Sequence, residues 1–249
     1  MLKPFWVDLH IHTVLSPCGE LEMGAPEIVQ KAIEQKIDII GISDHNTCEN
    51  YPALCECAQN KIKVLSCIEI QSAEDIHLLT IFPTYDKTLE CKNWYWDKMQ
   101  NIKNDSEKFG YQLVINKENE IEKEEEKFLI QGVGYEIDQI IDKVHDLDGI
   151  AILAHVDRPS FSYPVSLGPI PQDYKADAFE LSSRVNSNEA DIWRINYPNR
   201  TFIRSSDSHE LNRISRLNCT KMMLEAPTFN EIKMALHGEE NRRVVWPWG

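Results

Sequence analysis

The sequence predicts an α/β fold built around a largely parallel sheet. Short apolar stretches typical of strands alternate with amphipathic stretches typical of helices along most of the 249 residues. The hydrophobic fraction of 42% and the charged fraction of 27% are ordinary for a globular protein. No repeat and no Gly/Ser-rich linker divides the chain. We therefore expect a single domain over residues 1–249, with an excursion at about residues 89–135.

The first half of the chain shows the alternation clearly. A strand ends in Asp8-Leu9-His10-Ile11-His12-Thr13, and Pro26 and Glu27 mark the start of a helix. Pro83 ends the last strand of this half. After the first strand, the pattern predicts a helix over 25–35, a strand over 37–46, a helix over 51–60, and strands over 64–70 and 76–82.

The middle of the chain is less regular. It predicts a long helix over 89–109, followed by strands over 111–115 and 127–130. Between these strands lies the acidic run 118–126, which we expect to be a solvated hairpin loop. Residues 135–147 again have helical periodicity. The excursion therefore precedes a return to the alternating pattern.

The second half predicts further strands that end in polar residues. Apolar stretches indicate strands over 149–155, 178–184 and 201–209. A short strand over 220–225 and a terminal helix over 228–237 complete the chain.

Composition limits the environment and the partners. The N-terminus lacks a signal-peptide pattern, and no apolar run approaches the roughly 20 residues of a membrane span. With seven cysteines, an odd number, we expect reduced thiols, a cytoplasmic location and no membrane partner. The formal charge of −14 disfavours wrapping of a phosphate backbone, so we expect a small phosphorylated substrate and no long nucleic acid. The oligomeric state is left open.

Metal-competent side chains gather at the predicted strand ends. The carboxyl ends of parallel strands share one face of such a fold, so these side chains are expected to meet there. Imidazole and carboxylate together suit Zn²⁺, Mn²⁺ or Fe²⁺, and the ligands are too many for one tetrahedral ion. We expect two or three divalent ions, with Glu69 as a bridge, that activate a water for attack on a phosphoryl group. The candidates are His10, His12, Asp44, His45, Glu69, His77, His155, Asp207 and His209.

These motifs resemble the PHP (polymerase and histidinol phosphatase) domain family. The resemblance rests on the His10/His12 motif, Ile42-Ser43-Asp44-His45-Asn46, Cys67-Ile68-Glu69-Ile70, Ala154-His155 and Ser206-Asp207-Ser208-His209. It implies a distorted (β/α)7 TIM-like barrel with a trinuclear metal site. By analogy, the first ion would take His10, His12, Glu69 and Asp207, the second Glu69, His77 and His155, and the third His45 and His209. Asp44 would orient a ligand or exchange a proton with the leaving group.

The sequence departs from the family pattern just after Thr13. Many members carry an Asp five residues, or a His six residues, after the second histidine of the first motif. Those positions are Pro17 and Cys18 here, in the loop 16–23. Either a Cys18 thiolate or Glu22 would complete the third metal site, and the sequence leaves both open.

Arginines near the strand ends are candidates for binding phosphate. Arg158 follows His155 by three residues and can make a bidentate contact, while Arg184 and Arg204 are weaker candidates. The resulting hypothesis is a metal-dependent phosphoesterase that acts on a small phosphorylated metabolite or short nucleotide. Two alternatives are an amidohydrolase-type C–N hydrolase and a non-catalytic metal-binding or regulatory module. The first normally uses a strand lysine where Glu69 stands, and the second needs a partner domain.

Overall fold

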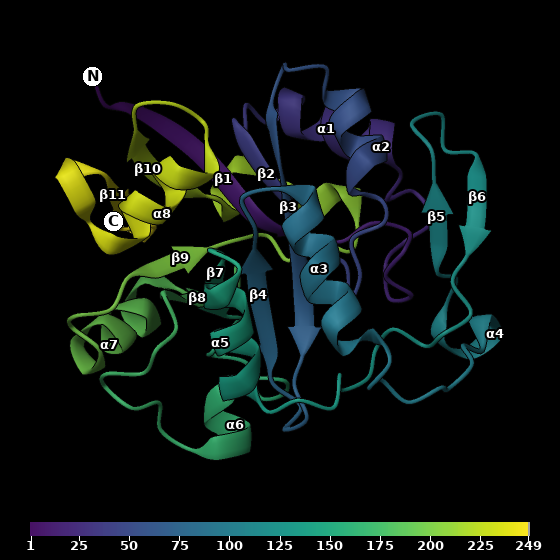
Figure 1. Ribbon diagram of the computed structural model, residues 1–249. Helices are drawn as coiled ribbons and strands as arrows, with labels where there is room; N and C mark the ends of the chain where they lie inside the picture. The colour runs from purple at the N-terminus through teal and green to yellow at the C-terminus, as the bar shows by residue number, and fades with distance from the viewer. Residues whose placement is uncertain (249) are drawn as a thin grey trace.

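The main sheet of the protein has nine strands and is rolled into a nearly closed barrel (Figure 1). The computed structural model describes residues 1–248. The strand order is β11-β10-β1-β2-β3-β4-β7-β8-β9. The strands are β1 (Lys3–Ile11), β2 (Ile39–Ile42), β3 (Lys63–Gln71), β4 (His77–Ile81), β7 (Ile150–Leu153), β8 (Ala178–Leu181), β9 (Phe202–Arg204), β10 (Thr220–Leu224) and β11 (Arg243–Val245). The expected α/β barrel is confirmed.

Helices follow most of the strands and cover the outside of the sheet. They are α1 (Ala25–Glu34), α2 (Tyr51–Ala58), α3 (Tyr85–Trp96), α4 (Ser106–Phe109), α5 (Ile137–Asp146), α6 (Tyr163–Leu167), α7 (Ser187–Asn196) and α8 (Phe229–His237). Sequence patterns did not predict α6, α7 or β11. Within residues 1–248, no helix combines the length and apolar character needed to cross a membrane.

The sheet is less parallel than expected. Strands β1, β2 and β3 are parallel to one another, as are β7, β8 and β9. However, β4 is antiparallel to both β3 and β7, and β10 is antiparallel to β1. Only five residues connect β3 to β4, which is too short for the crossover that a parallel pair needs. The start of β4 therefore lies at the same edge as the ends of its neighbours.

The barrel is closed near the end of β1 by the segment that follows β9. The amide of His12 donates to the Ser208 carbonyl at 2.9 Å, and the Ser208 amide donates to the His10 carbonyl at 3.3 Å. A parallel bridge joins Ile11 to Ser208. The last predicted ligand motif is thereby hydrogen-bonded directly to the first.

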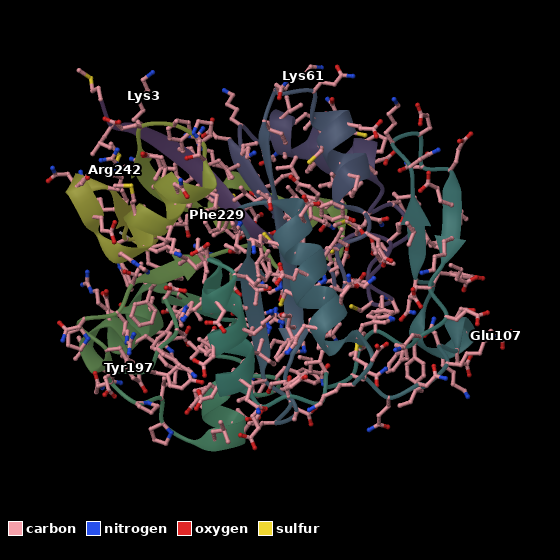
Figure 2. The ribbon with its side chains drawn as sticks, viewed as in Figure 1. Lys3, Lys61, Glu107, Tyr197, Phe229 and Arg242 are labelled. Carbon is pink, nitrogen blue, oxygen red and sulfur yellow. The ribbon has the colours of Figure 1, made fainter. Side chains whose placement is uncertain are left out.

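Apolar side chains fill the interior below the strand ends. Leu65 and Cys67 of β3 point inward with Leu79 and Ile81 of β4. Helix α8 closes the opposite end of the barrel, and its Phe229 belongs to the same cluster, near the centre of the side-chain view (Figure 2). The next inward position on β3 is Glu69, and the next on β4 is His77, so the interior changes from apolar to polar at one end.

A β-bulge in β1 interrupts the regular alternation of side chains along this strand. The pairing of β1 with β2 shifts register between Asp8 and Ile11. Leu9 belongs to the interior cluster, whereas Ile11 packs outside the barrel with the α1 and α2 helices. The extra residue of a bulge turns the following side chains. Because of the bulge, the consecutive residues Leu9 and His10 both face the interior, and His12 faces it as well.

The excursion differs in detail from its predicted elements. Helix α3 ends at Trp96, and only the short α4 follows within the predicted helix 89–109. The hairpin strands are β5 (Leu113–Ile115) and β6 (Ile121–Glu124), so the acidic run supplies a strand and residues 127–130 do not. All four side chains of β6 are exposed, which fits the expected solvation of this run. The hairpin lies at one side of the barrel, beyond α2 (Figure 1).

Candidate metal centre

A buried carboxylate, Glu69 of β3, stands at the centre of the polar end of the barrel. Its side chain is 1% exposed, and five imidazoles surround it. The ring nitrogens within 3.4 Å of its oxygens are His10 Nε2 (3.2 Å), His12 Nε2 (3.4 Å), His45 Nδ1 (3.0 Å), His77 Nδ1 (2.9 Å) and His155 Nε2 (3.1 Å). Burial acts to raise the pKa of Glu69, but these imidazoles hold it well below its ordinary value.

Asp207 is the second carboxylate of the centre. Its Oδ1 lies 3.5 Å from His10 Nε2, 3.4 Å from His12 Nε2 and 3.5 Å from His209 Nδ1. The guanidinium of Arg158 contacts its other oxygen. Burial opposes ionisation, yet the facing imidazoles and Arg158 hold the pKa of Asp207 well below its ordinary value. Both carboxylates are thus anionic in a site lined with nitrogen ligands.

Two of the candidate ligands have strained backbone conformations. His155 has a φ of 31° and Asp207 a φ of 47°, in the region that non-glycine residues seldom adopt. Each follows the end of a strand; His155 Nε2 lies 3.1 Å from Glu69 Oε1, and Asp207 faces His10 and His12. Backbone strain of this kind concentrates at functional sites, where surrounding contacts maintain it.

Glu180 of β8 orients two of the histidines, and sequence reasoning missed it. Its Oε2 lies 3.0 Å from His10 Nδ1 and accepts a hydrogen bond from the His155 amide at 3.2 Å. The other His10 nitrogen is thereby directed to Glu69. The available signal was a lone carboxylate in the strand Ala178–Leu181, whose four residues are all buried.

Asp44 lies behind the ligands and does not face the pocket. Its carboxylate accepts hydrogen bonds from the Thr13 amide (2.7 Å), the Thr13 hydroxyl (2.8 Å) and the Ser16 hydroxyl (2.7 Å). Ser16 Oγ in turn lies 2.9 Å from His12 Nδ1. Asp44 is therefore placed to orient His12 through Ser16, the first of the two roles expected for it.

The donor set fits divalent metal ions. Three groups have ligand atoms within 4.8 Å of one another: His10/His12/Glu69, His45/Glu69/His77 and His12/His45/His209. Within residues 1–248, His77 Nε2 and His155 Nδ1 are buried without a hydrogen-bond partner, and His45 Nδ1 approaches Glu69 without making a hydrogen bond. Converging imidazole and carboxylate atoms with unmet bonding capacity are typical of a metal centre.

The structure distinguishes the two candidates for the remaining ligand. Cys18 lies beside His45 and His209, and burial acts to raise its pKa, but the charge and hydrogen bonding of these imidazoles lower the pKa of the thiol to about 6. Glu22 is exposed, and it makes no hydrogen bond or ion pair with the histidines anywhere in residues 1–248. Of the two, only Cys18 is brought to the cluster.

A pocket of about 550 Å³ opens beside the centre. Cys18, Asp207 and His209 form its inner wall. Three arginines also line it, together with two glutamates, Pro159 and Ser160: these further charged residues are Arg158, Arg184, Arg213, Glu20 and Glu210. Arg213 was not predicted, whereas Arg204 turns away and donates to the Ser183 carbonyl at 2.8 Å. The pocket thus places positive side chains next to the predicted ligands.

A family comparison agrees with this geometry. The PHP domain family matches residues 8–188, which hold the first three ligand motifs and His155. The chain belongs to the PHP domain family. Asp207 and His209 lie beyond the matched residues, and the hydrogen bonds of Ser208 to His10 and His12 bring them to the candidate metal centre. No curated protein matches the chain significantly.

Solved structures share the fold of this PHP domain. The lesion-specific endonuclease from Pyrococcus furiosus is 19% identical with a TM-score of 0.71, and a complex of endonuclease Q with a 27-mer duplex substrate is 18% identical with a TM-score of 0.72. Each match covers 97% of this chain but 58% of the other. A protein from Bifidobacterium adolescentis, described as a metal-dependent phosphoesterase, is 16% identical with a TM-score of 0.56. The match covers 82% of this chain and 87% of the other.

The endonuclease Q complex corrects one expectation. Net charge led us to exclude long nucleic acid as a partner, and that exclusion is wrong, because a protein of this fold holds duplex DNA with an abasic lesion at its active site. Net charge averages over the whole surface, whereas binding depends on the charges around the pocket. Here the charges around the pocket are three arginines and three carboxylates (Glu20, Asp207 and Glu210), a local balance that differs from the overall charge of −14.

Proposed function

We propose that the protein is a metal-dependent phosphoesterase. The observation that carries the proposal is the arrangement of Glu69 among five histidines, next to a pocket lined by Arg158, Arg184 and Arg213. Imidazole and carboxylate ligands hold divalent ions, and arginines bind phosphate oxygens. A site that combines nitrogen and oxygen ligands with adjoining guanidinium groups is therefore suited to bind a phosphate ester and hydrolyse it.

The contacts among these side chains support an assignment of ligands to the proposed ions. His10, His12, Glu69 and Asp207 would hold one ion, and Glu69, His77 and His155 a second. His45 and His209 would contribute to a third. Such ions, whether Zn²⁺, Mn²⁺ or Fe²⁺, would supply Lewis acidity to the phosphoryl group and to an attacking water.

The protein's own side chains would orient the substrate and the ligands. Arg158, which touches Asp207 at the pocket wall, would bind a non-bridging phosphate oxygen, with Arg184 as a further contact. Asp44 would keep His12 in position through Ser16 rather than exchange a proton with the leaving group. Glu180 would do the same for His10.

The pocket supports a small phosphorylated metabolite or short nucleotide as substrate, because its volume of about 550 Å³ lies in the range of small-molecule sites. A second candidate is a phosphodiester of a DNA strand. It is favoured by the likeness of nearly the whole chain to endonuclease Q, whose complex holds a lesion-containing duplex. Both candidate substrates would use the same metal centre. They differ in whether a small molecule or a DNA strand enters the pocket.

The test is hydrolysis by the purified protein with Mn²⁺ or Zn²⁺ added. The panel contains phosphomonoesters, phosphodiesters of short oligonucleotides, a duplex with an abasic site, and amide substrates for the C–N hydrolase alternative. We expect phosphate-ester hydrolysis that His10→Ala and Asp207→Ala abolish. Hydrolysis of amides alone, or metal binding with no hydrolysis of any substrate, would reject the proposal, and the latter would favour a regulatory module.

A further inference from the structure

The loop between β1 and α1 presents Cys18 to the metal centre in a defined way. The Gly19 amide donates to the Ser16 carbonyl at 2.8 Å, and the Glu20 amide donates to the His209 carbonyl at 2.8 Å. A Cβ atom on Gly19 would lie 2.7 Å from the Thr13 carbonyl oxygen, so only glycine fits the turn. Cys18 is therefore held between a tight turn and the segment that carries His209.

The histidines next to this loop form a separate metal-competent group. Ligand atoms of His12, His45 and His209 lie within 4.8 Å of one another. The ring centroids of His12 and His209 are 4.0 Å apart, and those of His12 and His45 are 4.5 Å apart. His12 Nε2 already faces Glu69 and Asp207. This leaves His45 and His209 as a pair of candidate nitrogen ligands, and His209 lines the pocket together with Cys18.

We propose that the Cys18 thiolate is a direct ligand of a divalent ion that His45 and His209 also hold. The inference rests on the proposed metal centre and specifies one of its sites. Three protein ligands leave a fourth position open to the pocket, as in catalytic zinc sites. Glu22, the alternative ligand, does not line the pocket that Cys18 and His209 share.

A thiolate makes this site chemically different from the other two. Sulfur is a soft ligand that favours Zn²⁺ and Co²⁺ over Mn²⁺ and Mg²⁺, whereas sites built from imidazole and carboxylate accept the harder ions. The site at Cys18 is therefore expected to retain Zn²⁺ or Co²⁺ when Mn²⁺ fills the rest of the centre. A metal-substituted protein then carries a mixed set of ions.

The experiment uses Co²⁺ as a probe of the full-length protein. A Co²⁺ ion bound to a thiolate gives a ligand-to-metal charge-transfer absorption in the near ultraviolet, which nitrogen and oxygen ligands do not give. We expect this band in the unmodified protein and its loss in Cys18→Ser, with one fewer equivalent of tightly bound Co²⁺. Cys18→Asp is expected to restore the equivalent without the band.

Cys57→Ser is the matched control, because Cys57 is a partly exposed cysteine on α2, remote from the histidines. It should keep both the band and the metal content. Retention of the band in Cys18→Ser, or its absence from Co²⁺-saturated unmodified protein, would overturn the inference. A band that depends on Cys18 in a protein that hydrolyses no phosphate ester would uphold the inference and reject the proposed function. Hydrolysis of a phosphate ester by a protein that lacks the charge-transfer band would uphold the proposed function and reject the inference.

Discussion

Residues that touch the ligands from behind determine how the ligands point. Glu180 fixes the ring of His10, and its removal should weaken metal binding without changing the ligand set. We expect Glu180→Gln to lower metal affinity by about 10- to 100-fold, the usual effect of losing such a partner. Competition with a chromophoric chelator measures this affinity. Glu189→Gln, an exposed change in the N-terminal cap of α7, is the control, and equal affinities for the two variants would contradict the role.

Ser16 has a comparable role on the other side of the centre. It connects Asp44 to His12 and also accepts a hydrogen bond from the His45 amide at 3.2 Å. Ser16→Ala would leave a buried Asp44 oxygen short of one donor, a loss that costs about 1–3 kcal/mol. We expect the metal-free variant to unfold at a correspondingly lower denaturant concentration. An unchanged midpoint would show that Thr13 alone satisfies Asp44.

At the scale of elements, Asp177 joins three parts of the barrel's outer layer. Its oxygens lie 3.0 Å from His145 Nε2 of α5 and 2.8 Å from His237 Nε2 of α8, and one accepts from the Ala151 amide of β7 at 2.7 Å. Burial acts to raise the pKa of Asp177, but these hydrogen bonds hold it below its ordinary value of 3.8. The carboxylate is therefore more stable in the folded protein than in the unfolded chain.

This difference predicts an acid-sensitive contribution to stability. A depressed folded-state pKa stabilises the protein fully above the unfolded value of about 3.8, and the stabilisation is lost as the pH falls through the folded value. We expect Asp177→Asn to lower the free energy of unfolding by about 1–3 kcal/mol at pH 7 and to have a smaller effect near pH 3. Urea unfolding at the two pH values measures the difference, and an equal loss at both would refute the linkage.

For the molecule as a whole, the metal centre is a junction of the barrel. Its candidate ligands come from β1, β3 and β4 and from the segments after β1, β2, β7 and β9. An ion that binds only the folded state stabilises it by about 2.7 kcal/mol at a hundredfold excess over its dissociation constant. We expect added Zn²⁺ or Mn²⁺ to raise the unfolding temperature and a chelator to lower it. His10→Ala should greatly reduce this shift, and a shift of full size in that variant would place the stabilising ion elsewhere.

Local patterns were sufficient for much of this architecture. Alternating apolar stretches located the barrel strands from β1 to β10, because burial of a strand requires a run of apolar side chains. They failed in the excursion, where the exposed β6 buries nothing and its charged side chains resemble a loop. They also missed α7, whose apolar face is narrow: Ala190 is its only fully buried residue within the described chain.

The sequence by itself determined the chemistry of the candidate metal centre. Residue type decides which atoms can bind a metal, and the predicted strand ends locate those residues along the chain. Tertiary structure decided the rest. The reversal of β4 brings His77 to the ligand edge, and Ser208 brings Asp207 and His209 to β1. The fold also places Cys18, and not Glu22, beside His209 at the pocket wall. These outcomes depend on strand direction and on hydrogen bonds between residues far apart in the chain, which periodicity and spacing do not encode.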